Sequence, residues 1–138
     1  MNTFHLSVIT PERTFFEGDV ESLVVVTTDG EYAIMAHHAP VAVTVRECEI
    51  RIRQDGEVKR AAASAGFATV TPEETILMLQ TCEWPEDIDL KRAEEDAYEA
   101  QERMRQRQSQ IEYTLARSML ARARVRLKVG GKRQINDL

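Results

Sequence analysis

The chain has 138 residues, of which 43% are hydrophobic and 30% are charged, and its net charge at pH 7 is −5. The hydrophobic fraction is close to the globular norm, and no apolar run approaches the roughly 18 residues of a membrane-spanning helix. Residues 1–88 carry 6 Lys and Arg against 15 Asp and Glu, a net −9, whereas residues 89–138 carry 12 against 8, a net +4. An acidic body joined to a basic tail indicates a two-part adaptor whose tail binds an acidic partner.

Short alternating or β-branched segments, separated by turn signals, fill the first 84 residues. Gly18-Asp19 and Asp29-Gly30 are expected to interrupt strands, and Asp55-Gly56 to make a tight reversal. Ile50 and Ile52 alternate with charged residues and are expected to face inward. The predicted strands are Phe4–Ile9, Arg13–Phe16, Val20–Thr28, Tyr32–Met35, Val41–Val45, Cys48–Arg53, Glu57–Ala63, Phe67–Val70 and Thr75–Gln80. Turns about every 8–12 residues predict an all-β antiparallel sandwich or barrel.

Helical spacing replaces this pattern after Trp84. Residues 85–89 predict a helix start because an acidic side chain there caps exposed amides, and Ser109–Glu112 is a capping box for a second helix. Gly130-Gly131 is expected to end that helix and to leave Lys132–Leu138 frayed. The apolar stripes are Leu90, Ala93, Ala97, Ala100 and Met104, then Ala116, Leu120, Ala123 and Leu127. The two helices form an antiparallel hairpin, weakly held because alanines bury little surface, and it is either a movable arm or a static helical cap.

The residue types argue against an enzyme. The serines have no neighbouring histidine pattern for activation, and Gly30 and Gly66 lack the spacing of a phosphate-binding loop. His37 and His38 are adjacent, which is not a zinc-binding spacing, so no metal site is expected. Two isolated cysteines behave as small apolar residues and indicate a reducing, intracellular compartment.

Four segments carry recognisable motifs: Phe4–Pro11, Gly30–Pro40, Ala65–Phe67, and Glu83 with residues 88–93. Together they resemble the epsilon subunit of bacterial F-type ATP synthases. Phe4–Pro11 is similar to the family's first strand and Thr-Pro turn. Gly30–Pro40 resembles the loop Gly-Glu-x-Gly-Ile-x-Pro-x-His-x-Pro, with alanine in place of its second glycine and of its first proline. Ala65–Phe67 stands where the family has Gly-Gly and an aromatic or aliphatic residue. Glu83 followed by residues 88–93 resembles the family's Ile/Leu-Asp-x-x-Arg-Ala junction motif.

The resemblance implies an N-terminal antiparallel sandwich of about ten strands in residues 1–86 and a C-terminal antiparallel two-helix hairpin in residues 87–138. It implies a non-catalytic rotor subunit of the central stalk that contacts the gamma subunit, the c-ring and the α/β catalytic head. The expected location is the cytoplasmic face of the bacterial plasma membrane, reached only through the complex. In this family the extended hairpin inhibits ATP hydrolysis, and the folded-down form binds ATP in several members. No cofactor is required, and ATP is expected as a regulatory ligand.

Site residues follow from the same resemblance. The expected ATP-binding residues are Glu83, Ile88, Asp89, Arg92, Ala93, Arg122 and Arg126. Glu99 replaces an arginine of the ATP-binding relatives and would repel phosphate unless Arg103 substitutes for it. Glu31 and His38 are expected to contact the c-ring, or else are solvated rim residues. Inhibitory contact with the catalytic subunit is expected from Arg117, Arg122, Arg124 and Arg126.

The basic row of the second helix leaves other interpretations open. Nine basic residues and one acid lie within residues 105–133, which is either an ordinary solvated face or a binding surface for an anion. The alternative function is a free-standing sandwich whose basic tail binds nucleic acid. Tyr113 is the only aromatic residue after Tyr98, however, so the tail lacks the interleaved aromatics that stack on bases. Nucleic acid is therefore not an expected partner.

Overall fold

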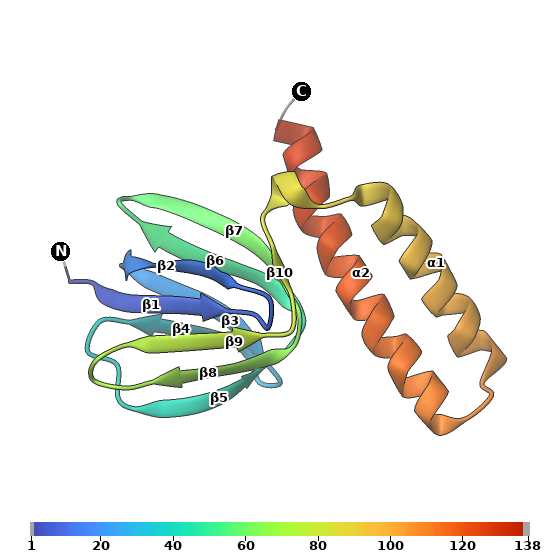
Figure 1. The fold of residues 1–138 in the computed structure, drawn as a ribbon, viewed down its shortest axis with the longest axis horizontal. Helices are drawn as coiled ribbons and strands as arrows, with labels where there is room; N and C mark the ends of the chain where they lie inside the picture. Colours follow the sequence, from blue (N-terminus) through green and yellow to red (C-terminus); the bar gives the residue numbers. More distant parts are fainter. Residues whose placement is uncertain (1, 137–138) are drawn as a thin grey trace. The chain divides into compact units, whose positions relative to one another are not determined.

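A computed structural model gives the fold and describes the backbone of residues 2–136 and the side chains of residues 2–131 (Figure 1). The chain separates into two compact units that divide between Glu83 and Trp84. The first unit holds ten strands, and the second holds a short 3-10 helix and two α-helices.

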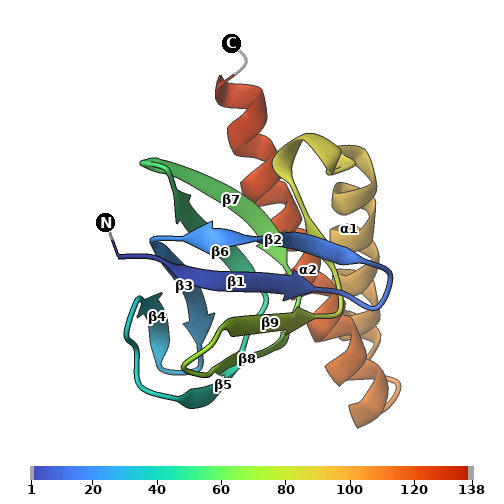
Figure 2. The same cartoon turned by 60° about the vertical axis from the view of Figure 1, so that its left-hand side comes forward.

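The first unit is a sandwich of two five-stranded sheets, which face each other in Figure 2. One sheet has the order β2-β1-β9-β8-β5 and the other β10-β7-β6-β3-β4. The strands are β1 (Phe4–Ile9), β2 (Thr14–Val20), β3 (Ser22–Thr27), β4 (Gly30–Met35), β5 (Val41–Val45), β6 (Cys48–Gln54), β7 (Glu57–Ala63), β8 (Gly66–Val70), β9 (Thr75–Leu79) and β10 (Cys82–Glu83). Pairing is antiparallel except between β1 and β9, which are parallel.

The core of the sandwich comes from the alternate residues that face the opposite sheet. Ile50 and Ile52 on β6 are fully buried, as the alternation in the sequence predicts, and so are Leu23 and Val25 on β3. The β6–β7 reversal is also where it was expected, since Asp55 and Gly56 both take the positive φ that a tight hairpin turn requires. The predicted sandwich fold is confirmed.

One predicted strand boundary is wrong. Gly18-Asp19 does not end a strand, because β2 continues to Val20 and the break comes at Glu21 instead. Gly18 pairs with Leu6 of β1 in the antiparallel ladder, which supplies hydrogen-bond partners for the backbone. The local sequence around Gly18 predicted a turn, but pairing with β1 keeps this segment in the strand.

The second unit contains the 3-10 helix η1 (Pro85–Asp87) and the helices α1 (Leu90–Gln106) and α2 (Gln110–Asn136), which run antiparallel and side by side in Figures 1 and 2. The predicted caps are present: Asp89 Oδ1 accepts from the Arg92 amide at 3.0 Å, and Ser109 Oγ accepts from the Glu112 amide at 3.0 Å. Arg107 adopts the left-handed conformation between the helices. The predicted hairpin is confirmed.

The predicted end of the second helix is also wrong. α2 runs through Gly130-Gly131 to Asn136, so residues 132–136 are helical rather than frayed, and residues 137–138 lie outside the described part. A Cβ at Gly130 would lie 2.7 Å from Leu90 Cδ2 and 3.2 Å from Ile88 Cγ2. Gly130 therefore lets α2 approach the start of α1 closely and does not stop the helix. Among the described helices, none combines the length and hydropathy that crossing a membrane requires.

Candidate functional site

Two of the arginines predicted to bind nucleotide meet at one carboxylate of the hairpin. Asp96 lies one turn after Arg92, and Arg92 Nε donates to Asp96 Oδ1 at 3.1 Å. Arg126, on α2, places its Nη1 3.7 Å from the other oxygen, Asp96 Oδ2. The Arg126 and Asp96 side chains are only 21% and 23% exposed, so water screens this pair less than it screens an exposed pair. The arrangement is one carboxylate shared by arginines of both helices.

The other predicted ATP-binding residues are distributed unevenly. Ile88 and Ala93 are buried, and Arg122 is exposed on α2 one turn before Arg126. Asp89 acts as the cap of α1 and holds the Arg92 amide. Glu83 belongs to the sandwich unit, where it is half-buried on β10 opposite Ala62 of β7. The hairpin thus brings Arg92 and Arg126 together at Asp96, while Asp89 contacts only the backbone amide of Arg92.

Glu99, the residue expected to repel phosphate, forms an ion pair with Arg103 one turn later on α1. Arg103 Nη2 donates to Glu99 Oε1 at 2.6 Å, and Arg105 pairs in the same way with Glu102 at 3.1 Å. Arg103 therefore compensates the charge of Glu99 through an exposed ion pair, and its substitution for the missing arginine stays a prediction.

The arginines in the basic row of α2 differ in exposure and in pairing. Arg117, Arg122 and Arg124 are exposed, whereas Arg126 is half-buried and paired with Asp96 of the other helix. Although only one acid lies within residues 105–133, Arg126 has an acidic partner on the other helix. Sequence reasoning missed Asp96 because its spacing from Arg92 indicates only a helical ion pair, and the register between the helices decides the second contact.

The two residues predicted to contact the c-ring lie on different parts of β4 and its following loop. Glu31 pairs with Arg51 of β6 at 3.1 Å on the exposed side of the sheet. His38 is held in the β4–β5 loop: its Nδ1–H donates to the Ala39 carbonyl at 2.7 Å, and the Tyr32 hydroxyl donates to its Nε2 at 3.1 Å. The structure therefore fixes both side chains without bringing them together.

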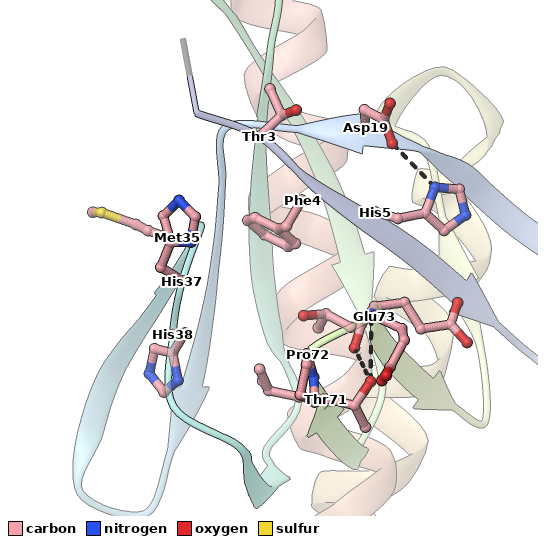
Figure 3. Close-up of a pocket in the computed structure, with 13 residues that line it drawn as sticks. Thr3, Phe4, His5, Asp19, Met35, His37, His38, Thr71, Pro72 and Glu73 are labelled. Carbon is pink, nitrogen blue, oxygen red and sulfur yellow. Dashed lines mark hydrogen bonds and ion pairs between the residues drawn. The ribbon is translucent and has the colours of Figure 1, made fainter.

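A cavity of about 580 Å³ opens beside this loop at one end of the sandwich (Figure 3). The start of β1, the β4–β5 loop and the β8–β9 turn surround it, and His5, Asp19, Met35, His38 and Glu73 are among its lining residues. Met35 is exposed there although it is large and apolar. Within the described residues, no cluster of three or more His, Cys, Asp and Glu side chains could hold a metal ion.

His5 joins β1 to two acidic residues of β2. Its Nδ1 lies 3.2 Å from Asp19 Oδ1 and its Nε2 lies 3.2 Å from Glu17 Oε2. The hydrogen bonds to Asp19 and then to Glu17 raise the pKa of His5 above its ordinary 6.5. Both carboxylates stabilise the charged imidazolium, and these ion pairs link the edge strand β2 to β1.

This contact predicts a pH dependence of stability. Because folding raises the pKa of His5, its charged imidazole stabilises the folded protein below pH 6.5. This contribution disappears as the pH rises through the folded-state pKa of His5. We expect the Tm of the wild type to fall as the pH rises through the pKa of His5, and the Tm of His5→Gln to fall less. Thermal unfolding at a series of pH values measures both. An NMR titration of wild-type His5 should give a pKa above 6.5, lowered by Asp19→Asn. A pKa at or below 6.5 would contradict the assignment.

Two strands of the sandwich present large apolar side chains to solvent. Phe67 of β8 and Met78 of β9 are cross-strand partners, and they are 48% and 43% exposed. A shallow cavity of about 230 Å³ adjoins them, lined also by Ile9 and Pro11. Next to Phe67, a Cβ on Gly66 would lie 1.9 Å from the Met78 carbonyl oxygen, so the two strands come together only around a glycine.

Comparison with known proteins covers both units. The ATP synthase delta/epsilon chain β-sandwich domain matches residues 3–85, and the long α-helix domain of the same chain matches residues 86–131. The chain belongs to the ATP synthase delta/epsilon chain family. The ATP synthase epsilon chain of Caldanaerobacter subterraneus subsp. tengcongensis is 41% identical over 133 residues, which cover 96% of each chain.

Two solved structures share the fold of this epsilon-type chain. One belongs to the Euglena gracilis mitochondrial ATP synthase (OSCP/F1/c-ring), with a TM-score of 0.78, 16% identity, and 93% of this chain and 81% of that chain covered. The other belongs to the central stalk/c-ring of the Tetrahymena thermophila mitochondrial ATP synthase, with a TM-score of 0.69, 13% identity, and 92% and 96% covered. The resemblance read from the sequence is confirmed, and the chain is a non-catalytic epsilon subunit of an ATP synthase.

Proposed function

We propose that this epsilon chain is a rotor subunit of the central stalk that couples the catalytic head to the c-ring and restrains ATP hydrolysis through its hairpin. The observation that supports this most is the match of both units to epsilon chains over nearly the whole length. Its partners are then the gamma subunit, the c-ring and the α/β head, on the cytoplasmic face of a bacterial plasma membrane. The functional division is residues 1–86, which bind the rotor, and residues 87–138, which regulate it.

The sandwich offers two surfaces for these partners. The exposed Phe67–Met78 pair and the cavity beside it form an apolar surface suited to the gamma subunit, because monomers rarely leave such residues clustered in water. The β4–β5 loop with His38, and Glu31 on the same strand, are assigned to the c-ring contact. His38 suits this role because its two hydrogen bonds hold the ring in one orientation.

The hairpin has the composition of an arm that can change its packing. The small residues Ala93, Ala100, Ala116 and Ala123 are all buried, and an alanine removes little apolar area from water at about 25 cal/mol per Å². Most of the stability of a helix in a protein comes from tertiary packing of its apolar face. We call the folded-down arrangement of the hairpin its closed form. The free energy that favours this form is therefore small enough for a partner or ligand to shift the equilibrium.

The regulatory contacts come from the basic row of α2. In the extended form, Arg117, Arg122, Arg124 and Arg126 contact acidic residues of the catalytic subunit and oppose rotation. In the closed form, Arg122 and Arg126, with Arg92 and Asp89 at the start of α1, bind the phosphates and the adenine end of ATP. Because both states use the same arginines, ATP shifts the population towards the closed form.

A calorimetric titration tests the nucleotide part of this proposal. We expect the full chain to bind Mg-ATP and the double variant Arg122→Ala with Arg126→Ala to lose binding, because each charge-assisted hydrogen bond contributes about 1.5–3 kcal/mol. The loss should be at least about 100-fold in affinity. Arg117→Ala with Arg124→Ala is the matched control, since it removes two exposed arginines from another face of α2. No heat from the wild type at millimolar ATP would remove the nucleotide claim and leave the rotor role.

A further inference from the structure

We propose that Asp96 is an internal counter-anion that masks the phosphate-binding arginines of the closed hairpin. This inference rests on the proposed binding of ATP to that hairpin, and it assigns Asp96 as the residue that lowers the affinity of the hairpin for ATP. The ligand class is a polyphosphate, which must displace the Asp96 carboxylate before it reaches Arg92 and Arg126.

The geometry gives Asp96 two separate partners. Its Oδ1 accepts from Arg92 on the same helix at 3.1 Å, and its Oδ2 faces Arg126 of α2 at 3.7 Å. The single carboxylate therefore uses one oxygen within α1 and the other across the hairpin. A phosphate group that binds between two guanidinium groups divides its oxygens in the same way.

Charge explains why an anion is needed at this position. Without Asp96, the cationic groups of Arg92 and Arg126 would repel each other across the interface between the helices. Because Asp96 is only 23% exposed, it neutralises them in a partly screened setting and holds the two helices in one register. This polar contact adds to the apolar packing of the hairpin, in which Leu120 and Val129 are buried beside the small alanines.

Competition follows from the covalent attachment of Asp96. A carboxylate on the same helix has a high effective concentration at the two arginines, so an external phosphate meets arginines that are already occupied. The closed hairpin therefore does not require nucleotide, and the apparent affinity for ATP is reduced by the fraction of hairpins in which Asp96 is engaged. Removing this charge leaves Arg92 and Arg126 open to an external phosphate.

The first test compares Asp96→Asn with wild type and with Glu95→Gln, all as full chains, in calorimetric titrations with Mg-ATP and with inorganic triphosphate. Glu95 is the adjacent exposed carboxylate, so its variant changes the net charge equally without touching the cluster. We expect Asp96→Asn to bind both ligands about tenfold more tightly than wild type, and Glu95→Gln to match wild type. Affinity unchanged or weakened in Asp96→Asn would overturn the masking role while wild-type binding still supports the proposed function.

The second test requires no nucleotide. Thermal melting followed by the helical circular-dichroism signal is compared for Asp96→Asn, Arg126→Gln and the double variant. We expect the double variant to lower Tm no further than the more damaging single variant, because both remove the same contact. Fully additive losses would overturn the contact between the helices. If neither the wild type nor any variant binds ATP or triphosphate, the nucleotide part of the proposed function and the masking role both fail. A non-additive loss of Tm would then show that Asp96 only links the two helices.

Discussion

Removing residues 88–138 is expected to raise the rate of ATP hydrolysis by the assembled complex severalfold while leaving assembly intact. The deleted segment carries every residue of the hairpin that would oppose rotation, whereas the sandwich that binds the rotor stays whole. The measurement is steady-state ATPase activity of complexes reconstituted with full-length or shortened chain, under conditions in which the intact complex is latent.

A full-length variant separates charge from bulk in that experiment. Neutralising the exposed arginines Arg117, Arg122 and Arg124 to Gln keeps the helices but removes the cations assigned to the inhibitory contact. Hydrolysis should rise part of the way towards the value of the shortened chain. Equal, low hydrolysis by all three complexes would show that the hairpin does not restrain the motor.

Gly66→Ala is expected to produce the largest loss of stability of any single substitution considered for this chain. The added methyl group would lie 1.9 Å from the Met78 carbonyl oxygen and 3.0 Å from Leu79 Cα, both backbone atoms of the neighbouring strand β9. Because no flexible side-chain end can move aside, β8 and β9 must separate. We expect a loss of at least about 3 kcal/mol, a fall in Tm of roughly 12 °C or more for a domain of this size.

Thermal unfolding followed at the β-sheet circular-dichroism band measures this loss. Gly131→Ala is the control, since among the described residues nothing lies within 4 Å of its added Cβ, and a helical Gly-to-Ala change stabilises by about 0.5–1 kcal/mol. The same distortion should weaken binding to gamma, because Phe67 and Met78 belong to the two displaced strands. A Gly66→Ala protein with the wild-type Tm would refute the close approach of the two strands.

Local patterns in the sequence predicted the features that local physics determines. The β6–β7 hairpin follows from the alternation around Ile50 and the turn at Asp55-Gly56, and the start of each helix follows from the capping residues Asp89 and Ser109. Each of these depends on residues a few positions apart. The turn or cap therefore leaves the same signal whatever packs against it.

The features that failed or were missed depend on a distant partner. Gly18 was read as a break, but its pairing with β1 continues the strand, and Gly130 was read as a helix end, but its contact with Ile88 and Leu90 continues the helix. The link from Asp96 to Arg126 requires the register of two helices, which no spacing within one helix encodes. The resemblance named Arg92 and Arg126 as candidates, but only the packed structure shows that they meet at Asp96.

The claim that the hairpin is a movable arm whose position sets the rate of hydrolysis can be tested by a distance measurement in the assembled complex. Dyes attached at Glu57→Cys on the sandwich and Tyr98→Cys on α1 occupy exposed positions. The native Cys48 and Cys82 are buried, and burial raises the pKa of Cys82 to about 12, which keeps its reactive thiolate scarce. Single-molecule energy transfer should show two populations whose ratio changes with ATP and follows the hydrolysis rate. One fixed distance, unchanged while ATP and the hydrolysis rate vary, would contradict the account.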